Sequence, residues 1–433
     1  MTEIGELETW IERQVDYSVV ALERAISATH LVRRRDAFGQ VVTPVRGSVL
    51  ASCVGGDWDP EPDYFFHWLR DSAIVMRSVA DLMADASGAA ARRRWRRHFE
   101  DFVRFSLALS ALDGAVFLMR SQHREATRPG HRKFLRPESE LRALAGDALL
   151  GEPRFNPDGT IDVQRWSRPQ YDGPALRALA CLRYLAAGGP PTRQLEQLLR
   201  LDLRFTVRHA DAPCIGAWEE PGQNRHHYHV ALVQLGALVH GRAWAGAAAD
   251  EWRAAEERLR AGLDRHWSQR LGVYVAIRDA PGDTAGDLVD AAQLLAVLDA
   301  ELPRGPHSVQ DERVQATMTA IEALFARDLP INRALPVGRA PALGRYRGDR
   351  FFGGGAWYAT TLAAAGLRYR RKETDHGDAF LATLRALTPE VGALPEQVDR
   401  TTGSPVSARD LTWSHAAFVR TARLRAEALA RRR

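Results

Sequence analysis

Apolar residues recur at steps of three and four positions along most of this chain, the spacing of one helical face. The first such run begins at the N-terminus and comprises Ile4, Leu7, Ile11, Val15, Leu22 and Ile26. Further stretches with this spacing are 71–85, 91–112, 139–150, 173–188, 191–209, 225–241, 247–267, 286–301, 309–328, 354–371, 376–388 and 408–431. Strand-like runs are few and short: Val41–Ala51, Val116–Met119 and Val273–Ile277. The pattern therefore predicts an all-α protein with about twelve helices.

A second regularity concerns the loops that precede several of these helices, because they concentrate Trp, Tyr, Arg and carboxylates. We call these the decorated loops; they are Tyr64–Asp71, Trp166–Asp172, Trp218–His229, Gly344–Trp357 and Leu394–Trp413. The helices between them follow ordinary loops. This alternation indicates inner and outer helices of a closed toroid, with the decorated loops meeting at one end in one site.

Two carboxylates stand at predicted helix starts. Asp172 precedes an early proline, Pro174, and is expected to cap its helix. Asp71 opens the helix over 71–85. Compensation of the helix dipole explains such residues without any function, so the neighbouring residues must decide their roles.

The length of 433 residues suggests two or three domains. The segments that could separate domains, Ala280–Asp283 and Pro303–His307, are both short. We therefore expect one domain over residues 1–433.

The formal net charge is +5, and nearly all of the positive charges are arginines, since Lys133 and Lys372 are the only lysines. The scarcity of lysine argues against P-loop and Schiff-base chemistry. The run Arg92–Arg97 could be a nucleic-acid patch. No groove-reading motif accompanies it, so we interpret it as a solvated helix face and expect no nucleic-acid partner.

The three cysteines, Cys53, Cys181 and Cys214, lie in apolar surroundings and form no C-x-x-C pair. This favours buried free thiols in a reducing compartment. The first residues lack the basic and apolar regions of a signal peptide. No apolar run of about 18 residues is present, so no membrane contact is expected. The sequence thus predicts a cytoplasmic protein.

Motifs for nucleotide binding, zinc-dependent hydrolysis and serine hydrolysis are missing. His226, His227 and His229 lack partners at metal-ligand spacing, so we expect neither a metal nor a cofactor. Gly353–Gly355 is interpreted as a tight turn rather than a phosphate cradle.

The remaining tryptophans, arginines and carboxylates are typical of a carbohydrate site. Indoles stack on the apolar face of a sugar ring, and Arg and Asp bind its hydroxyls. Glycosidic cleavage needs two carboxyl groups. The candidates are the Glu219–Glu220 pair, which follows Trp218, and Glu396 in a largely apolar turn.

Five segments together resemble the signatures of the glucoamylases, glycoside hydrolase family 15. They are Tyr64-Phe-Phe-His-Trp68-Leu-Arg70-Asp71, Trp166-Ser-Arg168-Pro-Gln-Tyr-Asp172-Gly-Pro, Trp218-Glu219-Glu220, Gly344-Arg345-Tyr346 with Trp357, and Pro395-Glu396-Gln397 with Ser407 to Trp413. They occur in the family's order and span the chain from about Gly47 to Ala417. The match of all five is far more specific than any one motif.

The resemblance implies an (α/α)6 barrel, a toroid of six inner and six outer helices. It also implies an inverting exo-hydrolase that releases β-D-glucose from non-reducing ends of α-glucans, with Glu219 as general acid and Glu396 as general base. Gln397 and Ser407 would orient the base and its water. The residues implied to bind substrate are Tyr64, Trp68, Arg70, Asp71, Trp166, Glu220, Arg345, Trp357, Gln397, Ser407 and Trp413.

The sequence departs from the familiar fungal pattern at two places. Gly216 stands where that pattern has an acidic residue, and Gly353-Gly-Gly-Ala replaces the segment before Trp357. Chain-length and linkage preference therefore stay open. The alternatives are a trehalase, an α-1,6-specific glucodextranase or isomaltosidase, and a non-catalytic glucan-binding relative. The expected partners are soluble maltooligosaccharides or glycogen fragments, and the sequence does not indicate an oligomeric state.

Overall fold

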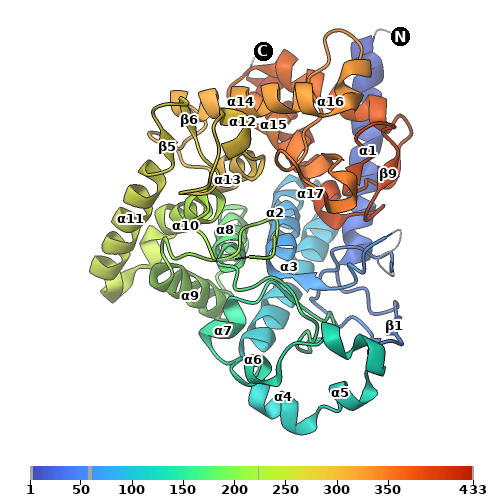
Figure 1. Cartoon of the computed structure of the whole chain (residues 1–433), viewed down its shortest axis with the longest axis vertical. Coiled ribbons are helices and arrows are strands. Elements are labelled where there is room, and N and C mark those ends of the chain that lie inside the picture. Colours follow the sequence, from blue (N-terminus) through green and yellow to red (C-terminus); the bar gives the residue numbers. More distant parts are fainter. Residues whose placement is uncertain (1–2, 57–60, 223, 432–433) are drawn as a thin grey trace.

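The computed structural model describes residues 3–56, 61–222 and 224–431. Within them the chain forms two concentric sets of α-helices (Figure 1). The inner helices are α2 (Leu69–Asp85), α8 (Asp172–Ala186), α10 (Tyr228–His240), α13 (Ala292–Ala300), α15 (Tyr358–Arg370) and α17 (Thr412–Ala430). The outer helices are α1 (Glu3–Ala25), α3 (Ala89–Ser110), α9 (Arg193–Arg208), α11 (Ala249–Asp264), α14 (Glu312–Asp328) and α16 (Thr374–Leu387).

The sequence explains which helices lie inside. α10 contains no acidic or arginine side chain, and α13 is buried along its whole length, as expected for helices covered on every side. α9 is amphipathic instead: Leu195, Leu198 and Leu203 are buried while its other face carries exposed charges. The Thr192 hydroxyl caps this helix by accepting a hydrogen bond from the Leu195 amide at 3.2 Å.

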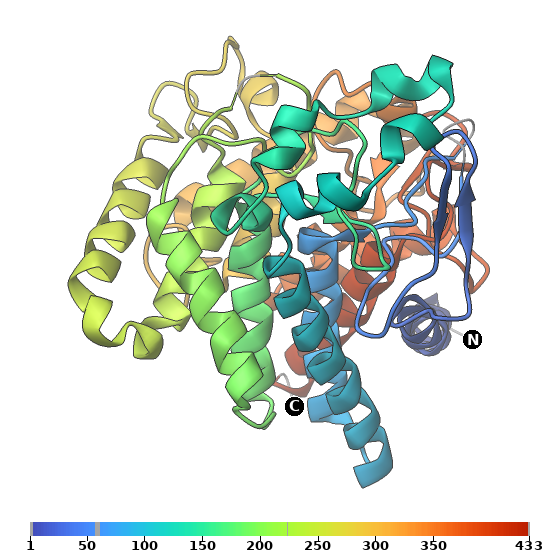
Figure 2. The ribbon, with the colours of Figure 1, turned by 90° about the horizontal axis from the view of Figure 1, so that it is seen from below.

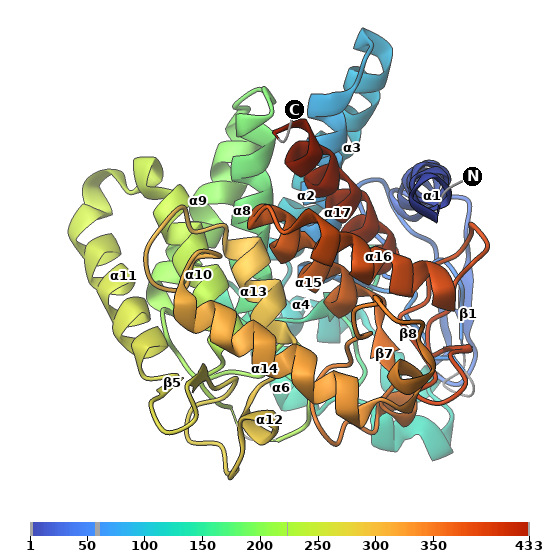
Figure 3. The same cartoon turned by 90° about the horizontal axis from the view of Figure 1, so that it is seen from above.

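The inner helices form a closed ring. α2 packs on α8, α8 on α10, α10 on α13, α13 on α15, α15 on α17, and α17 returns to α2. Figures 2 and 3 show the barrel from two opposite sides, with helices such as α3, α8 and α9 seen along their length. The contact of α10 with α13 needs Gly236, because a Cβ there would lie 2.7 Å from the Cα of Ala300. The expected (α/α)6 barrel is confirmed.

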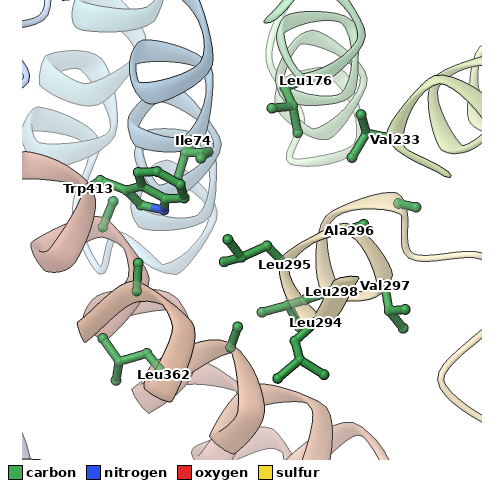
Figure 4. Close-up of a cluster of buried hydrophobic side chains, with 14 of the residues drawn as sticks. Ile74, Leu176, Val233, Leu294, Leu295, Ala296, Val297, Leu298, Leu362 and Trp413 are labelled. Carbon is green, nitrogen blue, oxygen red and sulfur yellow. The ribbon is translucent and has the colours of Figure 1, made fainter. Parts of the chain in front are cut away.

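The centre of the ring is filled with apolar side chains. Figure 4 shows that every inner helix supplies at least one of them. The labelled examples are Ile74, Leu176, Val233, Leu294, Leu295, Ala296, Val297, Leu298, Leu362 and Trp413. The barrel is therefore a packed core, and a site can form only at one of its ends.

Short helices and strands connect the main helices. The helices are α4 (Gly114–Arg120), α5 (His123–Ala126), α6 (Glu138–Arg142), α7 (Asp147–Leu150), α12 (Ala285–Leu288) and the 3-10 turns η1 (Pro129–Phe134), η2 (Arg242–Trp244), η3 (Gly246–Ala248), η4 (Pro330–Ala334) and η5 (Phe351–Gly353). The strands are β1 (Arg33–Arg35), β2 (Gln40–Val42), β3 (His67–Trp68), β4 (Arg154–Phe155), β5 (Trp267–Ser268), β6 (Val273–Tyr274), β7 (Ala356–Trp357), β8 (Gln397–Val398) and β9 (Pro405–Val406).

Several predicted elements need correction. Val116–Met119 is not a strand but part of α4, because Asp113 caps that helix. Of the strand predicted over Val41–Ala51, the first residues pair in β2 and Val49 forms an isolated bridge to Ile26, but no continuous strand forms. The helices predicted over 139–150 and 286–301 are each divided, into α6 and α7 and into α12 and α13.

Other expectations have mixed outcomes. Arg92–Arg97 lies on α3, where its arginines are exposed and Trp95 is buried, as predicted. The cysteines are free: Cys181 and Cys214 are buried and Cys53 is partly buried. In the described ranges, no helix is both long and apolar enough to cross a bilayer. The single domain over residues 1–433 stays a prediction, and residues 1–2, 57–60, 223 and 432–433 within it lie outside the described residues.

Every decorated loop leads into the N-terminus of an inner helix. Short antiparallel pairs connect neighbouring loops, with β3 on β4 and β8 between β7 and β9. Further backbone hydrogen bonds run from Thr412 to Ala51, from Ile215 to Pro169 and from Ala291 to Arg345. The loops are thereby fixed to one another around the same end of the barrel.

Candidate active site

The decorated loops enclose a cavity of about 280 Å³ at this end of the barrel. Eleven of the thirteen predicted site residues line it: Tyr64, Trp68, Arg70, Asp71, Trp166, Glu219, Glu220, Arg345, Trp357, Glu396 and Trp413. The other lining residues are Ala51, Ala217, Trp218, Pro221, Phe351 and Leu411. Residues from five separate loops thus converge on one cavity.

Glu219 is held by four hydrogen-bond donors. Its Oε1 accepts hydrogen bonds from the indole of Trp68 at 3.0 Å, from the Gln170 amide at 2.9 Å and from Arg70 at 3.2 Å. Its Oε2 accepts one from the Trp166 indole at 2.5 Å. The backbone of Glu219 is left-handed, with φ of 59°. Such a conformation costs about 1–3 kcal/mol in a residue with a side chain, and residues of this kind cluster at functional sites.

An arginine lies behind the two indoles. The guanidinium of Arg154 is 3.8 Å from the ring centroid of Trp166 and 5.0 Å from that of Trp68. Its Nε donates to Asp162 at 2.8 Å, and the residue is completely buried. The cation is therefore placed to fix the rings that bind Glu219.

Arg70 connects two carboxylates. It donates to Asp172 at 3.2 Å and to Glu219 at 3.2 Å. Asp172 makes no capping hydrogen bond, and the N-cap position of α8 is Tyr171, so the predicted capping role is wrong. Asp71 is buried beside Arg70 in the first turn of α2. Burial raises the pKa of Asp71 to about 6, against the lowering effect of Arg70.

Glu396 lies on the opposite wall and is only 3% exposed. Its Oε1 accepts a hydrogen bond from the Tyr64 hydroxyl at 3.1 Å, and its Oε2 accepts one from Ser407. Burial raises the pKa of Glu396 to about 7, while the Ser407 hydrogen bond, Arg345 and Tyr64 oppose that rise. This carboxyl therefore changes charge close to neutral pH.

Arg345 organises the mouth of the cavity. It donates to both oxygens of Asp349, to Glu220 at 3.2 Å and to the carbonyl of Trp218 at 3.3 Å. The Tyr346 hydroxyl also donates to Glu220. The Glu220 side chain is 53% exposed, so it lies at the rim. Trp218 and Trp357 pack edge to face here, with ring centroids 5.5 Å apart.

Comparison with known proteins identifies the family. The model for glycosyl hydrolases family 15 matches residues 36–374 and 369–423. The chain belongs to glycosyl hydrolases family 15. Glucoamylase 1 of Rhizopus oryzae is 27% identical over 421 residues, which cover 83% of this chain and 64% of the relative. The probable glucoamylase of Schizosaccharomyces pombe is 26% identical over 413 residues, which cover 83% and 81%.

This family 15 chain thus spans slightly less than two thirds of the Rhizopus relative. Solved structures share its fold. The glucoamylase from Saccharomycopsis fibuligera superposes with a TM-score of 0.74 at 21% identity, covering 98% of this chain and 96% of that one. The Hormoconis resinae glucoamylase superposes with a TM-score of 0.76 at 23% identity, covering 98% and 74%.

Two predicted residues of the family 15 site lie behind its wall. Ser407 reaches Glu396, as expected. In the described part of the chain, the Gln397 side chain makes no hydrogen bond to Glu396. Its side-chain oxygen accepts a hydrogen bond from the backbone amide of Gly355 at 2.9 Å, and its side-chain nitrogen donates to the backbone carbonyl of Phe351 at 3.2 Å. Among the described residues the Gln397 side chain holds the turn before Trp357, and its role in orienting the base and its water stays a prediction.

The two departures from the fungal pattern have structural reasons. A Cβ on Gly216 would lie 2.5 Å from the imidazole of His227, which occupies the space of a side chain. Gly353 and Gly354 have positive φ, and a Cβ on Gly355 would lie 1.9 Å from the Val398 carbonyl oxygen. The interpretation of Gly353–Gly355 as a tight turn is confirmed. None of these glycines lines the catalytic cavity.

Sequence reasoning missed several residues of the site. Gln170 lies inside the second motif but was not singled out. Phe351 lies inside the decorated loop Gly344–Trp357, beside its ring partners Phe352 and Trp357. Arg154 carries no local signal, because its partners Phe66 and Trp68 come from a distant segment. The described residues contain no group of three or more His, Cys, Asp or Glu side chains suited to a metal.

Proposed function

We propose that this family 15 chain is an inverting exo-glucosidase that releases β-D-glucose from the non-reducing ends of soluble α-glucans. The observation that carries the proposal is the pair of carboxyls, Glu219 and Glu396, which line the same cavity from different loops. Glycosidic hydrolysis with inversion uses two carboxyl groups in this way, one as acid and one as base.

The size of the cavity supports an exo mode of action. Its volume of about 280 Å³ is at the lower limit of small-molecule sites, which range from about 300 to 1,000 Å³. It lies at one end of a packed barrel. It therefore accommodates the end of a glucan chain rather than a length of it.

Glu219 is suited to act as the general acid. It would protonate the glycosidic oxygen as the bond to the anomeric carbon breaks, so that the departing sugar leaves as a neutral alcohol. Trp68, Trp166 and Gln170 hold its carboxyl group in place. A fixed acid is a more effective catalyst than a mobile one, because the proton donor is already oriented toward the glycosidic oxygen.

Glu396 is suited to act as the general base. Its carboxylate would remove a proton from a water molecule, which attacks the anomeric carbon from the other face of the ring. Ser407 and Tyr64 each donate a hydrogen bond to this group and fix its orientation. The same hydrogen bonds stabilise the ionised form that a base requires.

The remaining lining residues would bind the sugars. Arg70, Asp71 and Arg345 present charged groups to the hydroxyls of the terminal glucose. Glu220, at the rim, would bind the adjacent sugar. Tyr64, Trp68, Trp166, Trp357 and Trp413 provide aromatic walls for the apolar face of the ring.

Two experiments test the function. Glucose release is measured from maltose, maltotriose, isomaltose, trehalose, glycogen and dextran, and we expect the α-1,4-linked substrates to be hydrolysed fastest. Preference for trehalose or isomaltose would instead support the corresponding alternative. NMR of early product should show β-glucose, and early α-glucose would refute inversion.

Variants test the two carboxyls. Glu219→Gln and Glu396→Gln should each lower kcat by at least 10³-fold, a loss in the range for removing a catalytic group. Glu257→Gln, on the exposed face of α11, is the control and should keep parental activity. Near-parental turnover in either site variant would refute its role and favour the non-catalytic alternative.

The cellular setting is part of the proposal. Free cysteines, two of them buried, suit a reducing compartment such as the cytoplasm. Maltooligosaccharides or glycogen fragments would then be the substrates. Cell fractionation tests the location, and recovery of the protein outside the cell would contradict it.

A further inference from the structure

A second cavity adjoins the catalytic cavity. Its volume is about 440 Å³, larger than that of the catalytic cavity. The residues of the segment Ala217–Pro221 line both cavities. We call this second space the rear cavity. It is lined by 215–222, Arg225, His227, His229, 276–277, Ala280, 287–290, 292–293 and Tyr346.

The rear cavity has the make-up of a small-molecule site. Ile215, Ile277, Leu288 and Val289 give it apolar walls. Its buried polar side chains are His229, Asp290 and Gln293. A mostly apolar concave surface with a few convergent polar groups is the usual form of a ligand pocket.

His229 still has capacity for a ligand. The residue is only 4% exposed, and its Nδ1 has no hydrogen-bond partner, although Asp172 lies 3.9 Å away. No side chain or carbonyl in the described ranges bonds to its Nε2 either. A buried polar group without a partner costs roughly 1–3 kcal/mol, so a hydroxyl in the rear cavity that satisfies it would bind favourably.

The electrostatics of the cavity select an uncharged ligand. Burial lowers the pKa of His227 to about 4, so the imidazole is neutral at physiological pH. Three acidic side chains of the lining are already paired, Glu219 with Arg70, Glu220 with Arg345 and Asp287 with Arg347, so a cationic ligand would have to compete for them. The acidic residues also outnumber the one arginine of the lining, Arg225, and this disfavours an anionic ligand. A sugar satisfies all these conditions, because it has an apolar ring face, hydroxyls and no charge.

The rear cavity is coupled to the catalytic acid in two ways. Glu219 belongs to the segment that lines both cavities, and its backbone there is left-handed. In addition, His229 faces Asp172, which accepts a hydrogen bond from Arg70, and Arg70 donates to Glu219. An occupant that moves His229 or the segment would therefore displace the acid.

We propose that the rear cavity binds one hexopyranose, with free glucose as the natural candidate, and that its occupancy slows catalysis by displacing Glu219. The choice of glucose rests on the proposed function, since glucose would be the product. The bound product would act from outside the catalytic cavity, and substrate would not displace it.

Equilibrium dialysis with radiolabelled glucose tests the site. The parent chain should bind two glucose molecules. Ala276→Phe, which fills the rear cavity, should bind one, and Ala276→Ser, which leaves it open, should bind two. Asp71→Ala, which damages the catalytic cavity, should also bind one. If Asp71→Ala binds none, or if Ala276→Phe still binds two, the proposal is refuted.

The same measurements separate this proposal from the proposed function. If the catalytic cavity does not bind sugar, the parent binds one glucose that only Ala276→Phe removes. If the rear cavity is not a site, the parent binds one glucose that only Asp71→Ala removes. Should Ala276→Phe fail to fold, Leu288→Trp blocks the cavity from a partly exposed position and replaces it.

Turnover tests the coupling. At saturating maltotriose, added glucose should lower the kcat of the parent and of Ala276→Ser at least twofold. In Ala276→Phe, glucose should raise only the apparent KM. An unchanged kcat in the parent would refute the coupling between the cavities.

Discussion

Arg154 and Trp166 form a stacked pair, with the guanidinium carbon 3.8 Å from the ring centroid. The same guanidinium carbon lies 4.1 Å from the ring centroid of Phe66. Two of the guanidinium nitrogens have no hydrogen-bond acceptor among the described residues, so the aromatic rings are their partners. The indole of Trp166 in turn donates to Glu219. The pair connects a buried charge to the acid of the site.

Replacement of this cation should therefore affect catalysis more than binding. We expect Arg154→Met, which keeps the bulk but removes the charge, to lower kcat about tenfold. This equals about 1.4 kcal/mol, within the range of a desolvated cation–π contact. KM should change less than twofold, and Arg154→Lys should recover part of the loss. A variant that unfolds at lower temperature but keeps the parental kcat would show that Arg154 is only structural.

The pH dependence of activity should reflect the environment of Glu396. The base must be ionised, and burial raises its pKa to about 7, so kcat/KM should rise with pH around neutrality. Ser407→Ala removes a hydrogen bond that favours the ionised form. The rising limb should then move to higher pH by about one unit. Movement to lower pH, or no movement, would contradict the assignment of Glu396 as base.

The same carboxyl should reduce stability at alkaline pH. Because its folded pKa lies above the ordinary 4.5, the folded chain keeps a proton that the unfolded chain releases. This contribution is complete below pH 4.5 and is lost as pH rises through about 7. Glu396→Gln cannot ionise, so at pH 8 it should be more stable than the parent by about 1–3 kcal/mol.

Denaturant unfolding at several pH values measures this difference. The advantage of Glu396→Gln should shrink as the pH falls toward 4.5. The exposed control Glu257→Gln should show no such trend. A constant difference across the pH range would mean that the ionisation of Glu396 is not its source.

Two glycines of the same turn offer a matched comparison. Gly353 has positive φ but nothing within 4 Å of an added Cβ, so Gly353→Ala should cost only about 1–2 kcal/mol of stability. Gly355→Ala would place its Cβ 1.9 Å from a backbone oxygen of β8. It should cost more than 3 kcal/mol and lower activity, because β7 carries Trp357. Equal melting temperatures for the two variants would contradict this explanation of the turn.

Much of the architecture could be predicted from the sequence. Apolar periodicity predicts the helices of both sets, although inner helices such as α2 and α17 also bury charged side chains. Glu219 and Glu396 could be predicted as site residues because a carboxylate in an aromatic or apolar loop is unusual unless it has a function. Their loops precede inner helices, and that alone brings them to the same end of the barrel.

Other features depend on contacts that no local pattern encodes. Val116–Met119 has the composition of a strand, yet the cap from Asp113 decides for a helix. Arg154 is one arginine among many in the sequence, and only folding places it between aromatic rings from distant segments. Gln397 follows the base directly, but its amide is used by the turn at Gly355.

Closure of the inner ring has a consequence for synthesis on the ribosome. The last inner helix, α17, packs on both α15 and α2, and it brings Trp413 to the cavity. Until this helix leaves the exit tunnel, α2 and α15 expose apolar faces to water. A nascent chain that stops before residue 412 should therefore be inactive and should bind chaperones that recognise exposed apolar segments. Activity should arise in one late step, when the first and last inner helices meet.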